Sequence, residues 1–242
     1  MRALLLLFWP LLLGLGPEPT DATFRLTQQR FPRVRTAYAA RWSALQTDLQ
    51  RRHLAADQLE LYLRAFKVGR RVEVWARNRG QGRYQLLRRY AIAGTSGTLG
   101  PKLRAGDGQV PEGCYRIDRY NPNSLYHLSL GLDYPNATDR ARGEADPGGD
   151  IFIHGSDVTI GCLPITDAYI EELYVLAVEA RAAGQADIPV HIFPFELTAT
   201  DLDAHWHSPH YAFWQTLAPV YRYFEQHRTL PPTDAAGDYG VR

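Results

Sequence analysis

The chain has 242 residues, with 27 basic and 26 acidic side chains, and 45% of its residues are hydrophobic. A formal net charge of +1 argues against the broad cationic surface that nucleic-acid-binding proteins usually present. The hydrophobic content argues against intrinsic disorder, and two cysteines, Cys114 and Cys162, are too few for a disulfide scaffold. We therefore expect a globular protein that does not act on nucleic acid.

The first residues have the pattern of an export signal. Arg2 is followed by an apolar run over 3–15 and then by a stretch rich in Gly, Pro and Glu. About a dozen apolar residues fit a secretory signal peptide better than a membrane span, which needs roughly 20. We predict a signal peptide over 1–22 and an exported protein that is not embedded in a membrane after cleavage. The alternatives are an uncleaved N-terminal anchor and a mistaken start of the protein sequence.

Hydrophobic periodicity predicts a helix followed by a series of strands. Tyr38, Trp42, Leu45 and Leu49 recur at helical spacing and predict a helix over 34–54. The pattern then favours strands at 59–66, 72–76, 84–93, 114–120, 126–132 and 150–154. Between them, 94–113 is a long loop rich in Gly and Pro, and loops of this length are usually functional or disordered.

The C-terminal part alternates between helix and strand. Thr166 and Asp167 can cap a helix that ends near Gly184, and a strand is expected over 188–195. Aromatic residues in the tail predict one or two helices that cover the sheet, and Pro219 should kink or divide them. The elements together predict a mainly β fold with flanking helices at the N-terminus, after Cys162 and at the C-terminus.

The segment 150–162 carries the most informative chemistry. An apolar strand leads to His154 and Gly155, and Cys162 follows directly after Gly161. A cysteine nucleophile needs a base within hydrogen-bonding reach to form its thiolate near neutral pH. The backbone N–H groups of Gly161 and Cys162 are candidates to bind a developing oxyanion. A histidine and a cysteine at this spacing are by themselves more often structural, so spacing alone does not assign catalysis.

The same segment resembles the signature of a known family. His-Gly at 154–155 followed by Thr-x-Gly-Cys at 159–162 is similar to the signature of the L,D-transpeptidase (YkuD-like) catalytic domain, a secreted bacterial peptidoglycan enzyme with a β-rich fold. Further motifs over roughly 60–200 resemble its YafK-like branch of murein enzymes. These motifs are at 96–102, 106–107, 110–113, 121–124, 134–139, 165–167 and 193–195.

The resemblance implies a reaction and a location. By this resemblance Cys162 is the nucleophile and His154 the general base, with no cofactor or metal, and the protein works in the periplasm. Its partner is a peptidoglycan stem peptide, in which the thiolate attacks the L-centre carbonyl of meso-diaminopimelate and forms a thioester. An amine acceptor then completes transpeptidation, or water completes hydrolysis. The implied organisation is a signal peptide (1–22), a helical segment (23–57), a catalytic domain (58–200) and a helical extension (201–242).

Two positions depart from the pattern of the wider family. Thr159 stands where most members have serine, and Pro164 stands where they have arginine. Without that guanidinium a strong carboxylate partner is missing, which puts ordinary cross-linking in doubt. The YafK-like branch is expected to share this absence, and its known activity includes hydrolysis of the bond between peptidoglycan and a lysine of an outer-membrane lipoprotein. Such a hydrolase is one alternative, and a non-catalytic peptidoglycan-binding protein is another.

Several nearby residues have two interpretations. A backbone carbonyl or the side chain of Ser156, Asp157 or Thr159 can orient His154, although Asp157 is more simply a solvated loop carboxylate. Gly155 and Thr159 are expected to support the site through the backbone around it. Tyr134, Asn136 and Asp139 either line the donor site or only form a turn.

Other side chains are weaker candidates for a role in the site. Arginines that can replace the missing guanidinium are Arg116, Arg119, Arg140 and Arg142, each more simply a surface residue. Cys114 is most simply a small buried hydrophobe, and a reversible disulfide with Cys162 is the sharper hypothesis. The histidines at 205, 207 and 210 match no familiar zinc pattern, so we expect them to pack at a helix entry.

Overall fold

The computed structural model describes residues 22–233, so the predicted signal peptide, apart from Ala22, lies outside the described residues. Eight strands form one curled sheet in the order β3-β2-β1-β8-β4-β5-β6-β7. They are β1 (Leu59–Phe66), β2 (Arg71–Asn78), β3 (Gln85–Ala91), β4 (Gly113–Asn121), β5 (Ser129–Leu132), β6 (Phe152–His154), β7 (Leu163–Pro164) and β8 (Ile188–Phe193). The helices are α1 (Ala22–Gln28), α2 (Pro32–Arg51), α3 (Ala137–Arg142), α4 (Asp167–Ala182), α5 (Ala199–Ala204) and α6 (Tyr211–His227), with a short 3-10 turn at Ala56–Gln58.

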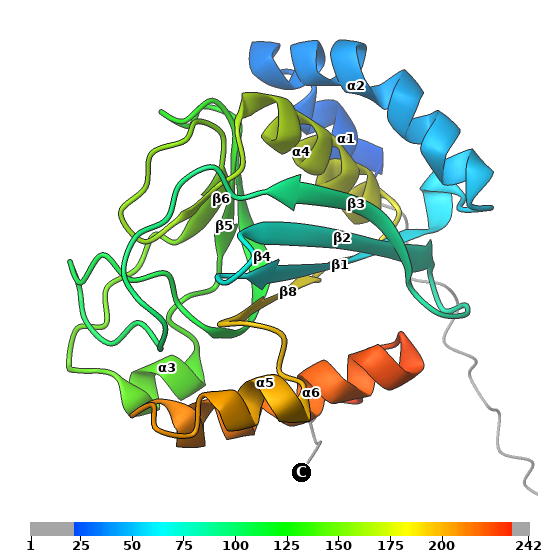
Figure 1. Ribbon diagram of the computed structural model, residues 1–242. Coiled ribbons are helices and arrows are strands. Elements are labelled where there is room, and N and C mark those ends of the chain that lie inside the picture. The colour runs from blue at the N-terminus through cyan, green and yellow to red at the C-terminus, as the bar shows by residue number, and fades with distance from the viewer. Residues whose placement is uncertain (1–21, 234–242) are drawn as a thin grey trace, which may run out of the picture.

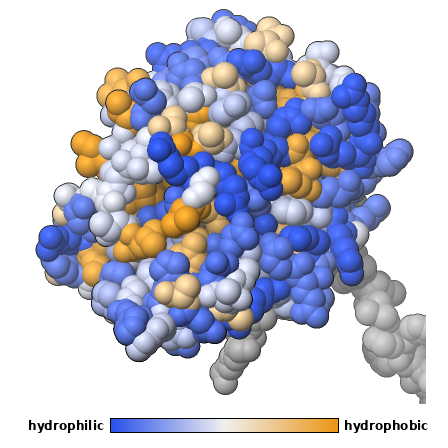
Figure 2. Space-filling view, viewed as in Figure 1, coloured by the Kyte–Doolittle hydropathy of each residue, from blue (hydrophilic) through white to orange (hydrophobic). Residues whose placement is uncertain are grey.

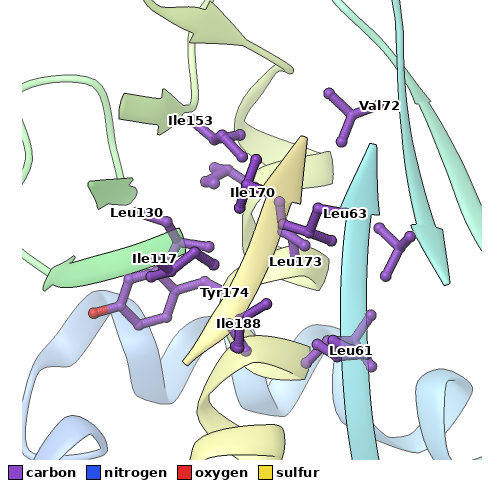
Figure 3. Packing of buried hydrophobic residues seen from close by; sticks show 14 of the residues in the cluster. Leu61, Leu63, Val72, Ile117, Leu130, Ile153, Ile170, Leu173, Tyr174 and Ile188 are labelled. Atoms are coloured by element: carbon purple, nitrogen blue, oxygen red, sulfur yellow. The ribbon is translucent and has the colours of Figure 1, made fainter. Parts of the chain in front are cut away.

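Helices cover both faces of the sheet (Figure 1). On one face α4 packs against strand residues such as Leu63 and Ile153, and its own Ile170 and Leu173 point back at them (Figure 3). Helices α1 and α2 pack on the outer side of α4. Because it is covered on both sides, α4 is apolar nearly all round, with ten buried residues among its sixteen.

The opposite face of the sheet is covered by the C-terminal helices. Phe66 on β1 and Phe193 on β8 form a second core cluster with Trp214 and Tyr221 of α6. Side chains alternate between the two faces of a strand, so β1 contributes to both cores. Its interior is therefore buried almost throughout, unlike a strand with one solvated face.

The structure confirms the predicted fold class and most of the predicted elements. The strand expected at 59–66 is β1, and the helix expected over 34–54 is α2, which begins at Pro32. The short helix α3 was not predicted, because the sequence indicated at most a turn at Asn136 and Asp139. No helix within 22–233 is long and apolar enough to cross a bilayer.

Two predicted helix boundaries need correction. Pro219 does not divide the C-terminal helix, because α6 runs through it from Tyr211 to His227. Buried side chains on both sides of the proline, among them Ala218 and Val220, stabilise the continuous helix. Thr166 precedes α4 but makes no capping hydrogen bond, since its φ of +72° is not the extended conformation of an N-cap.

Candidate active site

His154 is the last residue of β6 and is buried, with 2% of its surface exposed. Its Nδ1 lies 2.6 Å from the carbonyl oxygen of Gly155, and its ring packs on Tyr126 with centroids 4.6 Å apart. An N–H at Nδ1 donates to that carbonyl and leaves Nε2 as the nitrogen that accepts a proton. A backbone carbonyl therefore orients the imidazole, and Asp157 does not. Burial lowers the pKa of His154, so the ring is neutral at neutral pH.

Cys162 lies immediately before β7, which pairs in parallel with β6. The register places Ile153 beside Leu163 and His154 beside Pro164, which sets Cys162 level with Phe152. Alternate residues of a strand share a face, so Cys162 and His154 lie diagonally on the same face of the sheet. The register, extended by one residue beyond β7, thus directs the two predicted catalytic side chains to one face of the sheet.

The thiol of Cys162 is held by the backbone of the neighbouring strand. Its Sγ lies 3.5 Å from the carbonyl oxygen of Asp150 and accepts from the backbone N–H of Phe152. Among the described residues the thiol is hydrogen-bonded to this backbone and not to His154. Burial is the main cause that raises the pKa of Cys162 above that of an ordinary thiol. The site at rest therefore holds a neutral thiol and a neutral imidazole.

The two predicted oxyanion donors are already hydrogen-bonded. The N–H of Gly161 donates to the hydroxyl of Ser96 over 2.7 Å, and the N–H of Cys162 donates to the hydroxyl of Thr159 over 2.8 Å. The Thr159 hydroxyl in turn donates to the carbonyl of Cys162 over 2.9 Å. Thr159 therefore supports the loop that carries Cys162, and the Ser96 hydroxyl lies where the Gly161 N–H points.

The loop after His154 is fixed to the start of α4. The N–H of Ser156 donates to Asp167 Oδ1 over 2.8 Å, and the N–H of Thr166 donates to the carbonyl of Ser156 over 3.0 Å. A Cβ on Gly155 would lie 2.4 Å from that Asp167 oxygen and 2.7 Å from the carbonyl oxygen of Tyr126. Only glycine fits here, which explains its place next to the histidine. Asp157 is exposed, and its carboxylate accepts a long hydrogen bond, of 3.5 Å, from the hydroxyl of the neighbouring Ser156.

Tyr134, Asn136 and Asp139 make structural hydrogen bonds and do not line the pocket that Cys162 lines. The side chain of Asn136 caps α3 by accepting from the N–H of Asp139, and the Asp139 carboxylate accepts from the N–H of Asn136. Asp139 also accepts from the hydroxyl of Tyr115, and Tyr134 donates to the carbonyl of Pro147 over 3.0 Å. The geometry favours turn and capping chemistry over the donor-site interpretation.

A pocket of about 270 Å³ opens beside Cys162. Its walls come from the β1–β2 hairpin, the loop after β3, Val110 and Leu163. The charged residues that line it are Lys67 and Arg70. Lys67 is paired with Glu112 over 2.9 Å, whereas the Arg70 guanidinium donates to the carbonyl of Ala93 over 2.8 Å and pairs with no carboxylate of the described residues.

Sequence reasoning gave no role to two residues of this pocket, Arg70 and Ser96. Arg70 lies in a hairpin turn remote in sequence from Cys162, and no local pattern distinguishes it from the other arginines. Ser96 belongs to one of the motifs of the family resemblance, and that motif was the available signal. Apolar surface also gathers on the side of the molecule where the long loops lie (Figure 2), and Ile160 in the catalytic loop is 85% exposed.

The remaining candidates lie outside the pocket. Arg116 pairs with Asp133 and Arg119 with Asp150, Arg140 lines a different pocket, and Arg142 stacks on the ring of Phe213. Cys162 is a free thiol in this structure, and a reversible disulfide between it and Cys114 stays a prediction. Cys114 is half-buried rather than buried, because on its strand Tyr115 occupies the inward position. His205 stacks on Phe195 with centroids 4.1 Å apart, as expected for packing at a helix entry.

Comparison with known proteins assigns the family. Residues 62–192 match the model of the YkuD family, the L,D-transpeptidase catalytic domain. YafK of Escherichia coli strain K12, whose name assigns it provisionally to the L,D-transpeptidases, is 39% identical over 175 residues, 72% of this chain and 69% of YafK.

Solved structures give more distant matches. The helical cell shape determining protein Pgp2 of Campylobacter jejuni matches at 22% identity and a TM-score of 0.46, over 58% of this chain. Bd1075 of Bdellovibrio bacteriovorus matches at 22% identity and a TM-score of 0.39, over 69% of this chain and 56% of its own. The chain spans about half the length of Pgp2, at 49%. The family model and the identity to YafK establish that the chain belongs to the YkuD family of L,D-transpeptidase catalytic domains.

Proposed function

We propose that this protein is a cysteine acyltransferase of peptidoglycan, with Cys162 as nucleophile and His154 as general base. The observation that carries the proposal is the β6–β7 register, which sets both side chains on one face of the sheet. Cys162 also lines the pocket beside that face. The substrate is a stem peptide, attacked at the L-centre carbonyl of its meso-diaminopimelate.

The proposed mechanism follows from the neutral resting state of the two groups. His154 Nε2 takes the thiol proton as Sγ adds to the carbonyl carbon, and the carbonyl π electrons move onto oxygen. When the carbonyl re-forms, the C–N bond breaks and the imidazolium gives its proton to the leaving amine. His154 then removes a proton from an acceptor amine or from water, which attacks the thioester and releases Cys162.

The pocket suits a substrate with carboxylates and a peptide backbone. Within residues 22–233, Arg70 supplies a guanidinium that pairs with no carboxylate, and no acidic side chain lines this pocket. The other lining residues are glycine, serine, threonine and aliphatic residues. A stem peptide brings the carboxylates of diaminopimelate and alanine to such a surface. A substrate of this kind is met outside the cytoplasm, and the N-terminal sequence supports export to the periplasm.

Hydrolysis is the second candidate, and Pro164 is the observation that favours it. This residue stands beside His154 in the strand register, and a Cβ on Gly94 would lie 3.4 Å from its ring. An apolar ring there offers no hydrogen bond to a second peptide. The corresponding reaction cleaves the bond between diaminopimelate and the lysine of a peptidoglycan-linked outer-membrane lipoprotein.

Product analysis of purified sacculi tests the proposal. Wild-type protein is expected to yield new diaminopimelate cross-links for transfer, or loss of a diaminopimelate–lysine or D-alanine bond for hydrolysis. Cys162→Ala should lower turnover by several orders of magnitude because no other group forms the thioester, and His154→Ala should lower it nearly as far. Cys114→Ala is the matched control and should keep full activity. Unchanged sacculi, or activity in Cys162→Ala, would contradict the proposal.

A further inference from the structure

The loop that follows β3 closes against the loop that carries the nucleophile. A Cβ on Gly94 would lie 2.1 Å from the carbonyl oxygen of Asp157, so the two backbones are in direct contact. Two residues later the Ser96 hydroxyl accepts the N–H of Gly161 over 2.7 Å. Ser96 is half-buried and lines the same pocket as Cys162. The hydroxyl oxygen is thus fixed in position next to the residue that precedes the nucleophile.

The hydroxyls of Ser96 and Thr159, one in each of these two loops, differ in the hydrogen bonds that they make. A serine or threonine hydroxyl has a single proton to donate. Thr159 already donates its proton to the carbonyl of Cys162 while it accepts the N–H of the same residue. Ser96 accepts from Gly161, and its own proton is donated to no acceptor among the described residues. That proton is therefore available to an oxygen atom in the pocket.

We propose that Ser96 is a catalytic residue that donates its O–H to the substrate carbonyl oxygen when the Cys162 sulfur adds to the carbonyl carbon. The N–H of Gly161 donates to Ser96 Oγ and so polarises the hydroxyl toward donation. The backbone N–H of Gly161 then acts on the oxyanion through Ser96 rather than directly. This inference rests on the proposed role of Cys162 as nucleophile.

Ser96 keeps its proton throughout the proposed step. As the S–C bond forms, the π electron pair of the carbonyl becomes the third lone pair of an oxyanion, and the Ser96 hydrogen bond to that oxygen becomes charge-assisted. When the C=O bond re-forms, the electron pair of the C–N bond leaves with the amine, which takes its proton from His154. The competing interpretation is that Ser96 only blocks the Gly161 N–H and must move aside. The two interpretations predict opposite effects of removing the hydroxyl.

The test compares two reactions of Cys162 in a Cys114→Ala background. Acylation by p-nitrophenyl acetate, or by a stem tetrapeptide that contains meso-diaminopimelate, passes through an oxyanion. Alkylation by iodoacetamide displaces iodide at a saturated carbon and forms none. Ser96→Ala should slow acylation about 100-fold, as expected for one lost oxyanion donor, and leave the alkylation rate unchanged. Ser96→Thr restores a hydroxyl and should recover most of the acylation rate.

The controls separate this role from a structural one. Ser43→Ala, an exposed serine of α2, should change neither rate. An equal loss of acylation and alkylation in Ser96→Ala would mean that Ser96 only positions the loop, and acylation that is unchanged or faster would mean that it only blocks Gly161. Either result overturns the inference and leaves the role of Cys162 intact. Failure of wild-type protein to form a Cys162 thioester with either acyl donor would contradict the proposed function itself, and the inference with it.

Discussion

At the scale of single residues, burial acts in opposite directions on the two proposed catalytic groups. It raises the pKa of Cys162 and lowers the pKa of His154, since a low-dielectric environment disfavours the charged form of each. No side-chain hydrogen bond among the described residues joins the two groups. The resting site therefore differs from a preformed thiolate–imidazolium pair, and in the proposed mechanism the proton is transferred only when substrate is bound.

The reactivity of Cys162 toward a small alkylating agent should follow this charge state. Because its thiol pKa is raised, the thiolate fraction stays small at neutral pH and grows about tenfold per pH unit below that pKa. In Cys114→Ala protein, the rate of alkylation by iodoacetamide should thus still be rising above pH 8. A rate that is already constant from pH 6 upward would show a preformed thiolate and contradict this account.

Sequence motifs predicted Cys162 and His154 as the reacting residues, but gave no role to the side chains around them. Cys162 and His154 are close in sequence and lie on paired strands, so a local pattern was enough to predict them. Arg70 and Ser96 reach the pocket through a hairpin and a long loop, and that packing depends on tertiary structure. For Asn136 the two sequence interpretations were balanced, and its hydrogen bonds to the backbone favour the turn interpretation.

At the scale of elements, the site depends on how β6 joins the start of α4. The loop from Gly155 to Ser156 is held by Asp167 from one side and by the backbone of Tyr126 from the other. This arrangement fixes the backbone that orients the His154 ring. It leaves no room for a side chain at Gly155.

Gly155→Ala should therefore lower both stability and activity. Its Cβ would lie 2.4 Å from Asp167 Oδ1 and 2.7 Å from the backbone carbonyl oxygen of Tyr126, and the required shift of backbone should cost on the order of 1–3 kcal/mol. The free energy of unfolding, measured by urea denaturation, checks the first effect, and turnover of sacculi checks the second. Gly149→Ala is the control, because a Cβ there meets nothing within 4 Å. Equal stability of the two variants would contradict the steric argument.

Elements whose residues follow a regular hydrophobic pattern could be predicted from the sequence. Strand β1 matched its predicted range because its apolar residues alternate at 59, 61, 63 and 65, and Gly69 follows it in the turn to β2. The helix α6 did not follow its local signal at Pro219, because burial against the sheet outweighs one lost backbone hydrogen bond. At Thr166 the backbone departs from helix-capping geometry because its N–H is bound to the carbonyl of Ser156.

At the scale of the whole molecule, one buried carboxylate joins the C-terminal helix to the pocket. Glu112 has no exposed surface, and it accepts hydrogen bonds from Lys67 over 2.9 Å, from the N–H of Gly100 over 2.7 Å and from Trp214 Nε1 over 2.7 Å. Lys67 lines the pocket, Gly100 follows the pocket-lining residue Leu99, and Trp214 belongs to α6. The helix layer below the sheet in Figure 1 thus supports the pocket through Glu112.

Trp214→Phe should destabilise the protein by more than the loss of a few ring contacts would. The variant keeps an aromatic ring but removes the Nε1 donor, which leaves one buried oxygen of Glu112 without that donor, at a cost of about 1–3 kcal/mol. Urea denaturation measures the change, and Trp206→Phe is the control because Trp206 is 62% exposed. If both variants unfold at the same urea concentration, the link through Glu112 adds nothing to stability.

The most direct measurement of the central claim is peptide mapping of the acyl-enzyme by mass spectrometry. Protein is incubated with a stem tetrapeptide that contains meso-diaminopimelate, quenched in acid to preserve thioesters, and digested. The account predicts a stem-tripeptide adduct on the peptide that carries Cys162, absent from Cys162→Ala and present in Cys114→Ala. An adduct on Cys114, or turnover of the substrate in Cys162→Ala without any adduct, would contradict it.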